Sequence, residues 1–267
     1  MASLIRKYIQ KNLVICTLIA VTGCYHYPPS QAVDPRNETV ILVHGVARTV
    51  LSMRPLAVHL AQSGYDVHVI RYYSTRNYIR DHARNLEKKI IKLNISLKNH
   101  PIHFVTHSLG GIVVRKFLID HPDDPRFGRI VMIAPPNRGS EFADRLYNIP
   151  FFGRLCVPLH EVTTDKENTA NSLGNPAFDY EIGIIAGGKR DKEGFRKYIP
   201  GDDDSTVSVA STHLQGEKDH IVIKDSHHGL LSNQNTADQV THFLESGAFK
   251  RERDCTGGPP GRLGNIK

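Results

Sequence analysis

Four short apolar runs, rich in β-branched residues, recur between residues 39 and 134 and are separated by amphipathic stretches. A run without polar alternation is typical of a strand buried on both faces, as in a parallel sheet. Strands that alternate with helices indicate βαβ units. The sequence therefore predicts an α/β domain on a doubly wound, mostly parallel sheet. The runs are Thr39–Val43, Val67–Ile70, Ile102–Thr106 and Ile130–Ala134, and the helical stretches are Ser52–Ser63, Asn77–Leu97 and Gly110–Asp120.

The alternation of predicted strands and helices stops at residues 141–180, where aromatic and polar residues follow no helical or strand period. We expect this segment to be a cap inserted over the sheet. Two further strands, at Ile182–Ala186 and His220–Ile223, and a last helix, Thr236–Leu244, complete a domain expected to span 39–249. Residues 250–267 are charged and then rich in Gly and Pro, so we expect a disordered tail.

Composition excludes several classes of protein. The chain has 267 residues, of which 40% are hydrophobic and 23% charged, so it is neither a polytopic membrane protein nor a disordered chain. The formal charge of +7 comes without a run of Lys and Arg interleaved with aromatic residues, so the sequence does not predict a nucleic-acid partner. Four cysteines are too few for a disulfide scaffold in a chain of this length.

The first 23 residues have the organisation of an export signal. Three cations precede a short apolar run, Leu13–Val21, which ends at small residues. The sequence Val21-Thr22-Gly23-Cys24 resembles the lipobox of bacterial lipoproteins. The resemblance implies that Cys24 is acylated and begins the mature chain, and that Tyr25, in place of Asp, directs the protein to the outer membrane, facing the periplasm. An ordinary signal peptide and an uncleaved anchor are the alternatives.

Two further expectations follow from export. Residues 24–38, which contain three prolines, would form a semi-rigid tether between the lipid and the domain. Disulfides become possible in an oxidising compartment, and only Cys156 and Cys255 remain to form one. The sequence leaves open whether these two cysteines pair, because it does not give the distance between them.

The strongest chemical signal is Thr106-His107-Ser108-Leu109-Gly110-Gly111, which lies where a predicted strand ends and a helix begins. A Ser on so sharp a turn is exposed above the sheet edge, near the positive end of the following helix. The tight turn requires small residues two positions away on either side. Gly110 meets this requirement and Thr106 meets it only in part.

The chain resembles an α/β-hydrolase of the bacterial lipase and esterase type over residues 39–247. The resemblance implies the α/β-hydrolase fold with an inserted cap or lid. The chain departs from the family pattern at Thr106 and Ser205, where the family has Gly. The matching segments are Val43-His44-Gly45-Val46, His107-Ser108-Leu109-Gly110-Gly111, Pro135-Pro136-Asn137-Arg138-Gly139-Ser140, Asp204-Ser205-Thr206-Val207 and, further on, His227.

The resemblance implies a catalytic triad in the order Ser108, Asp204, His227. A Ser hydroxyl is a poor nucleophile until a base takes its proton, and a buried carboxylate must orient that base. Asp203 remains open as the acid and His228 as the base, because each adjoins the preferred residue.

The oxyanion hole would consist of the backbone N–H groups of Val46 and Leu109. Gly45 would allow close backbone approach, and His44 would form structural hydrogen bonds. We expect no cofactor and no metal. The adjacent carboxylates of residues 202–204 lack the alternating spacing of a Ca²⁺ loop, and His103 and His107 do not lie on a helix.

These expectations converge on a serine hydrolase of carboxylic esters that acts through an acyl-enzyme. The lipid anchor suggests lipophilic ester substrates at the bacterial envelope. An acyltransferase or thioesterase with the same triad is one alternative. A non-catalytic envelope protein that binds ligands on a hydrolase scaffold is another, because fold constrains function only loosely.

Overall fold

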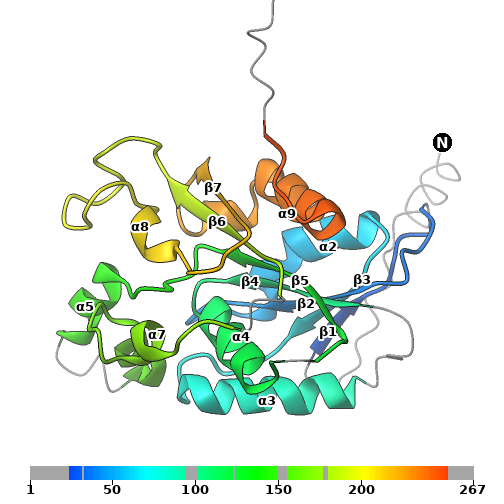
Figure 1. Ribbon diagram of the computed structural model, residues 1–267, viewed down its shortest axis with the longest axis horizontal. Helices are drawn as coiled ribbons and strands as arrows, with labels where there is room; N and C mark the ends of the chain where they lie inside the picture. Colours follow the sequence, from blue (N-terminus) through cyan, green and yellow to red (C-terminus); the bar gives the residue numbers. More distant parts are fainter. Residues whose placement is uncertain are drawn as a thin grey trace, which may run out of the picture.

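The computed structural model describes residues 24–31, 33–93, 101–122, 124–149, 155–176 and 180–251. A seven-stranded sheet in the order β1-β3-β2-β4-β5-β6-β7 forms its centre (Figure 1). Strand β1 is antiparallel to β3, and every other neighbouring pair is parallel. The strands are β1 (Cys24–Tyr27), β2 (Thr39–Val43), β3 (Asp66–Ile70), β4 (Ile102–His107), β5 (Phe127–Ile133), β6 (Ile182–Gly188) and β7 (Asp219–Lys224).

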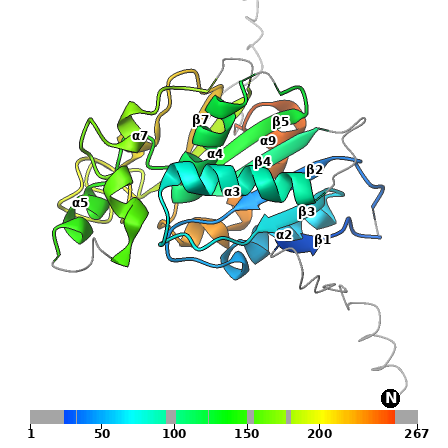
Figure 2. The same cartoon turned by 90° about the horizontal axis from the view of Figure 1, so that it is seen from below.

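Helices cover both faces of the sheet, which is the doubly wound arrangement that the sequence predicts (Figures 1 and 2). One hydrophobic core lies under α3 (Ile79–Lys92) and α4 (Leu109–Asp120), and the other lies under α2 (Arg54–Gln62) and α9 (Gln234–Ser246). In the described part of the chain, no helix has the length and hydropathy needed to cross a membrane.

The start of the chain differs from the expected tether. Residues 24–27 form the edge strand β1, which pairs with β3 from Cys24 opposite Ile70 to Tyr27 opposite Val67. The side chains of Cys24 and Tyr27 are buried in opposite cores, so both faces of this short strand contribute to packing. Proline lacks the backbone N–H that a ladder needs, and Pro28 follows the strand directly. Residues 24–27 therefore belong to the sheet, upstream of the domain boundary expected at residue 39.

The helix expected over residues 77–97 begins at Ile79 and ends at Lys92, and residues 94–100 lie outside the described residues. The last helix extends one turn or less beyond its predicted ends, from Gln234 to Ser246. Asn233 accepts a hydrogen bond from the Thr236 N–H at its start, and Gly247 ends it in the left-handed conformation. The signal segment 1–23 and residues 252–267 of the predicted tail also lie outside the described residues.

The segment expected to be a cap carries short helices between β5 and β6: α5 (Glu141–Tyr147), η2 (Val157–Val162) and α7 (Thr169–Ser172). In both views α5 and α7 lie to one side of the sheet (Figures 1 and 2). The buried guanidinium of Arg115, on α4, donates to the carbonyls of Ala170 at 2.9 Å and Gly174 at 2.8 Å. The Glu161 carboxylate accepts the Ile79 N–H at 2.7 Å. These bonds fix the cap to the layer of α3 and α4.

The other short helices of the described chain lie outside the cap. They are η1 (Val50–Met53), which leads into α2, α8 (Val209–Thr212), which precedes β7, and η3 (Gly229–Leu231), which precedes α9.

Candidate active site

Ser108 lies between the end of β4 and the start of α4 in a strained backbone conformation, with φ 53° and ψ −127°. Residues other than Gly rarely adopt such a conformation, and where it occurs the surrounding structure must enforce it. The Ser108 N–H donates to the Ile133 carbonyl at 2.9 Å, and the Ser108 carbonyl accepts the Gly111 N–H at 2.8 Å. The turn therefore has the strand-to-helix geometry that the sequence predicts.

The glycine after the turn is a steric requirement. A Cβ atom on Gly110 would lie 2.4 Å from the Val43 carbonyl oxygen and 2.8 Å from that of His44. Both contacts are to backbone, which cannot move aside without displacing β2. Gly110 therefore allows α4 to begin directly against the end of β2.

Thr106 occupies a position where the family has Gly, and the structure shows how its side chain fits. Thr106 is fully buried, and a Cβ on Gly111 would lie 3.3 Å from Thr106 Oγ1. The glycine at 111 leaves the space that the threonine uses. Within the described residues, Thr106 Oγ1 has no hydrogen-bond partner. A buried hydroxyl without a partner costs free energy, so this fit reduces stability.

Asp204 and His227 form a buried hydrogen-bonded pair. His227 Nδ1 lies 2.7 Å from Asp204 Oδ2, and both side chains are almost fully excluded from solvent. The other carboxylate oxygen accepts the N–H groups of Thr206 at 2.9 Å and Val207 at 2.8 Å. With the carboxylate as acceptor, the imidazole carries its proton on Nδ1, so Nε2 presents a lone pair.

The two neighbouring aspartates have different partners. Asp203 accepts the N–H groups of Ser205 at 2.6 Å and Arg196 at 3.0 Å. Asp202 accepts those of Lys189 and Arg190, each at 2.8 Å. Of the three acids that the sequence offers, only Asp204 contacts His227.

Ser205, the other departure from the family pattern, lies in the left-handed region with φ 84°. Glycine adopts this region without strain, which explains why the family has Gly here. In this chain the bond from the Ser205 N–H to Asp203 holds the strained residue in place.

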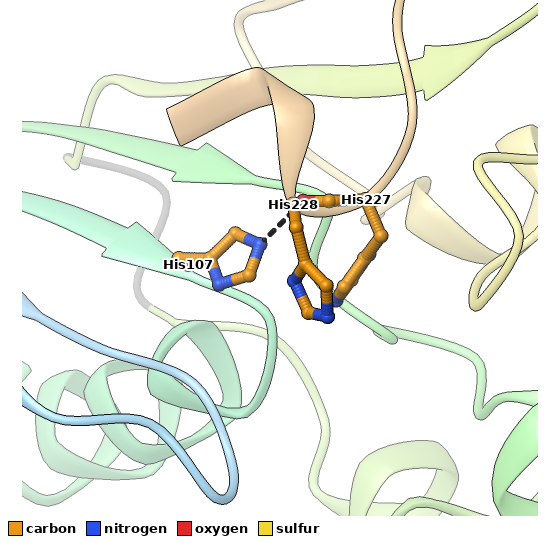
Figure 3. Close-up of side chains that lie close together, drawn as sticks. All are labelled: His107, His227 and His228. Carbon is orange, nitrogen blue, oxygen red and sulfur yellow. Dashed lines mark hydrogen bonds between the residues drawn. The ribbon is translucent and has the colours of Figure 1, made fainter. Parts of the chain in front are cut away.

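Three imidazoles meet beside the turn, as Figure 3 shows. His107 Nε2 donates to the His227 carbonyl at 2.9 Å, and the rings of His107 and His227 lie 4.6 Å apart. Burial, followed by the neighbouring His227, holds the pKa of His107 well below its usual range. The sequence predicts no role for His107. Its place at the end of β4, one residue before Ser108, is the only signal that could have marked it.

His228, the alternative base, lies in a different environment. The residue is exposed, its ring lies 5.3 Å from that of His227, and partial desolvation together with His227 lowers its pKa to about 4. His228 is therefore neutral at physiological pH. The Asp204 carboxylate orients His227 and not His228.

The predicted oxyanion residues adjoin the same turn. Val46 and Leu109 both line the cavity that contains Ser108 and His227. Leu109 is the first residue of α4, where a helix leaves its N–H groups without intrahelical acceptors. A Cβ on Gly45 would lie 2.9 Å from Ser108 Cβ, so the close approach expected of this glycine is present.

His44 is fully buried and its carbonyl accepts the Tyr72 hydroxyl at 2.5 Å. Its Nδ1 lies 2.9 Å from the Gly45 carbonyl, and its ring stacks on Tyr72 with centroids 4.4 Å apart. Burial lowers the pKa of His44. These contacts fix the ring of His44 within the fold, and the structural role expected for it stays a prediction.

The cavity has a volume of about 630 Å³. The cap supplies most of its apolar lining, and the charged side chains at its wall are Arg48 and Arg196. Cys156 also lines it, and burial raises the pKa of its thiol. Cys255 lies outside the described residues, so whether these two cysteines pair stays open. The apolar residues of the cap at this wall are Phe142, Ala143, Leu146, Leu155, Leu159 and Val162.

Among the described residues, two groups of side chains have the composition and proximity to hold a metal ion. One is His107, His227 and His228, where hydrogen bonds already engage Nε2 of His107 and Nδ1 of His227. The other, at the far edge of the sheet, is His26, Asp66 and His68.

Comparison with known proteins identifies the fold. No protein-family model matches the sequence, and no curated protein sequence matches it. Among solved structures, the mature lipase of Bacillus licheniformis superposes with a TM-score of 0.67 at 17% identity, over 84% of this chain and 97% of that one. A metagenomic carboxyl esterase superposes with a TM-score of 0.56 at 18% sequence identity, and the match covers 76% of this chain and 67% of that one.

A phospholipase of Legionella pneumophila, in complex with thio-NAD, gives a TM-score of 0.61 at 19% identity. The match covers 77% of this chain but only 56% of that one. Together with the sheet order and the turn at Ser108, these likenesses show that the chain has the α/β-hydrolase fold.

Proposed function

We propose that this protein is a serine hydrolase that cleaves carboxylic esters through an acyl-enzyme. The observation that carries the proposal is the buried Asp204–His227 pair, whose imidazole lines the same cavity as the strained Ser108. An imidazole that a carboxylate orients, at the wall of the cavity that also contains a Ser hydroxyl, is the arrangement that nucleophilic acyl transfer requires.

The first half-reaction forms the acyl-enzyme. Ser108 Oγ attacks the ester carbonyl carbon while its proton passes to Nε2 of His227. The N–H groups of Val46 and Leu109 stabilise the negative charge on the former carbonyl oxygen; each such donor typically contributes about 3 to 4 kcal/mol. The tetrahedral intermediate collapses, the C–O bond of the ester breaks, and the alcohol leaves with the proton from His227.

The second half-reaction releases the acid. Water attacks the acyl carbonyl and gives a proton to His227 Nε2, and the bond to Ser108 Oγ breaks as that oxygen regains the proton. Asp204 stays ionised throughout and stabilises the imidazolium that forms in each half-reaction. The reaction as proposed requires no cofactor.

We further propose that the substrates are lipophilic esters. Six apolar side chains of the cap line the cavity, and its volume of about 630 Å³ lies in the usual range for small-molecule sites. The lipase and phospholipase among the structural neighbours support the same class.

Labelling with a fluorophosphonate tests the nucleophile, because this probe reacts only with an activated Ser. The wild-type protein should react with the probe. The Ser108→Ala variant should not react, although its melting temperature should equal that of wild type. Ser232→Ala, which removes an exposed hydroxyl, is the matched control. A p-nitrophenyl ester series from acetate to palmitate would then give the acyl-chain preference. Folded wild type that neither labels nor hydrolyses any ester would favour the non-catalytic binding protein.

We also propose that the protein is exported and anchored by lipid on Cys24, at the outer membrane facing the periplasm. The lipobox-like sequence supports this proposal. Cys24 begins β1 and its side chain is only 9% exposed, so a lipid on its sulfur requires this side chain to leave the core. Cys24→Ser should move the protein from the membrane fraction to the soluble fraction. A serine variant that stays membrane-bound and is processed normally would contradict the anchor.

A further inference from the structure

His26, Asp66 and His68 form a compact cluster at the edge of the sheet, on β1 and β3. His26 and His68 are direct partners across the antiparallel pair. Asp66 precedes His68 by two residues, so strand alternation puts both side chains on one face. The cluster shares no residue with the cavity that contains Ser108.

The donor atoms of the cluster converge. His26 Nε2 lies 2.5 Å from Asp66 Oδ1, and His68 Nε2 lies 3.1 Å from Asp66 Oδ2. One donor atom from each of the three residues lies within 4.8 Å of the other two. Tetrahedral zinc, with bonds of about 2.0 to 2.2 Å, holds its ligand atoms roughly 3.3 Å apart. The two imidazoles are stacked with centroids 4.5 Å apart at 11°, so both rings must rotate about their side-chain bonds before their in-plane lone pairs meet at one ion.

The most buried ligand of the cluster is His68, which is only 9% exposed and whose Nδ1 has no hydrogen-bond partner within the described residues. An ion bound at Nε2 takes the lone pair of that nitrogen and leaves the imidazole proton on Nδ1. Neutral imidazole is the form that binds metals.

Asp66 supplies the negative charge. Its two oxygens face His26 Nε2 and His68 Nε2. One carboxylate and two neutral imidazoles would reduce the charge of a bound divalent ion from +2 to +1.

The cluster is open on one side. The side chains of His26 and Asp66 are 32% and 36% exposed, whereas that of His68 is 11% exposed. An ion can therefore enter from solvent and keep a water molecule as its fourth ligand, as three-ligand zinc sites do.

We infer that His26, Asp66 and His68 bind a divalent transition-metal ion of the zinc type. Two nitrogens and one oxygen favour zinc, cobalt or nickel over calcium and magnesium, which prefer oxygen ligands. The ion joins β1 to β3 and so fixes a four-residue edge strand that begins at Cys24. This inference is independent of the proposed hydrolase activity.

The test uses the full chain in detergent, purified without a polyhistidine tag. Titration with Zn²⁺ by calorimetry, and with Co²⁺ by visible absorption, should show one site in wild type, and Zn²⁺ should raise its melting temperature. His26→Gln and His68→Gln should each weaken binding by at least about a hundredfold, because losing even an outer-shell partner costs 10- to 100-fold. Asp66→Asn, which preserves side-chain shape, should also lower affinity.

His59→Gln is the matched control. His59 Nε2 pairs with one carboxylate, Asp238, at 3.6 Å and belongs to neither cluster, so this variant should bind zinc as wild type does. Circular dichroism melts without metal establish that each variant is folded. The inference is overturned if wild type binds neither ion at millimolar concentration, or if folded His26→Gln and His68→Gln keep full affinity. It is overturned too if His228→Gln, rather than His26→Gln, abolishes binding.

Discussion

At the scale of single residues, the partners of a side chain distinguish groups that are chemically identical. Asp202, Asp203 and Asp204 are consecutive, yet the first two accept only backbone N–H groups while the third also holds His227. His227 and His228 differ in the same way, because only His227 has a carboxylate on Nδ1. The catalytic assignment therefore rests on contacts between residues far apart in the sequence.

Asp204→Asn should lower kcat by about 10⁴-fold without unfolding the protein, because the amide favours the wrong imidazole tautomer. The measurement is steady-state hydrolysis of a p-nitrophenyl ester, with melting temperature as the control for folding. Asp202→Asn changes the same chemical group two positions away and should reduce kcat by no more than a few-fold. Comparable losses in the two variants would show that Asp204 does not orient the base.

At the scale of elements, the geometry of the site depends on how closely α4 approaches β2. Gly110 allows this contact, and Gly111 leaves room for the unusual Thr106. The strain at Ser108 is maintained because β4, α4 and β5 are each fixed by the sheet or by the core beneath α3 and α4. A small change at the start of α4 should therefore affect stability and catalysis together.

Gly110→Ala should destabilise the fold by about 1 to 3 kcal/mol, the usual cost of overpacking, and should also reduce activity. Its Cβ would meet two backbone carbonyls, so α4 must move away from β2. Thermal melts and ester hydrolysis measure the two effects. Gly174→Ala is the control, because a Cβ there meets nothing within 4 Å and only the positive φ of 74° is strained. Equal effects on activity from both variants would contradict the close-approach argument.

At the scale of the whole molecule, the fold buries several histidines in neutral form. Burial lowers the pKa of His82 to about 4, and burial with the stacked His213 lowers that of His220 to about 4. His107 and His44 are shifted in the same direction. In the unfolded chain these histidines bind protons near pH 6.5, whereas in the native state they do so only at lower pH, near pH 4 for His82 and His220. Between pH 6.5 and 4 the unfolded chain therefore holds more protons than the native state. Stability should therefore fall on acidification through this window.

Lowering the pH from 7.5 to 5 should reduce the free energy of unfolding, with His82 alone contributing on the order of 1 to 2 kcal/mol. Denaturant titrations at the two pH values measure the change. His82→Phe keeps an aromatic ring beside Tyr72, whose ring lies 4.9 Å from that of His82, and removes one titrating group. The variant should lose less stability than wild type over the same pH range. A wild-type stability that is flat or rises on acidification would refute the prediction.

Much of the fold follows from local sequence. The apolar runs from Thr39 to Ala134 predict four neighbouring parallel strands, because a continuous β-branched run is stable only when both faces are covered. The turn at Ser108 and the glycines at 45 and 110 are likewise local, since backbone conformation and close approach restrict the residue at each position. These features identify the place of the site before any contact is known.

Only the tertiary structure decided which Asp contacts which His, how Thr106 fits, and that residues 24–27 join the sheet as β1 instead of forming a tether. It also brought His26 to Asp66 and His68, some 40 residues along the chain. The physical reason is the same in each case. Hydrogen bonds, steric fit and edge pairing depend on atoms that the chain brings together only after long loops close, and residue type and spacing carry no information about those distances.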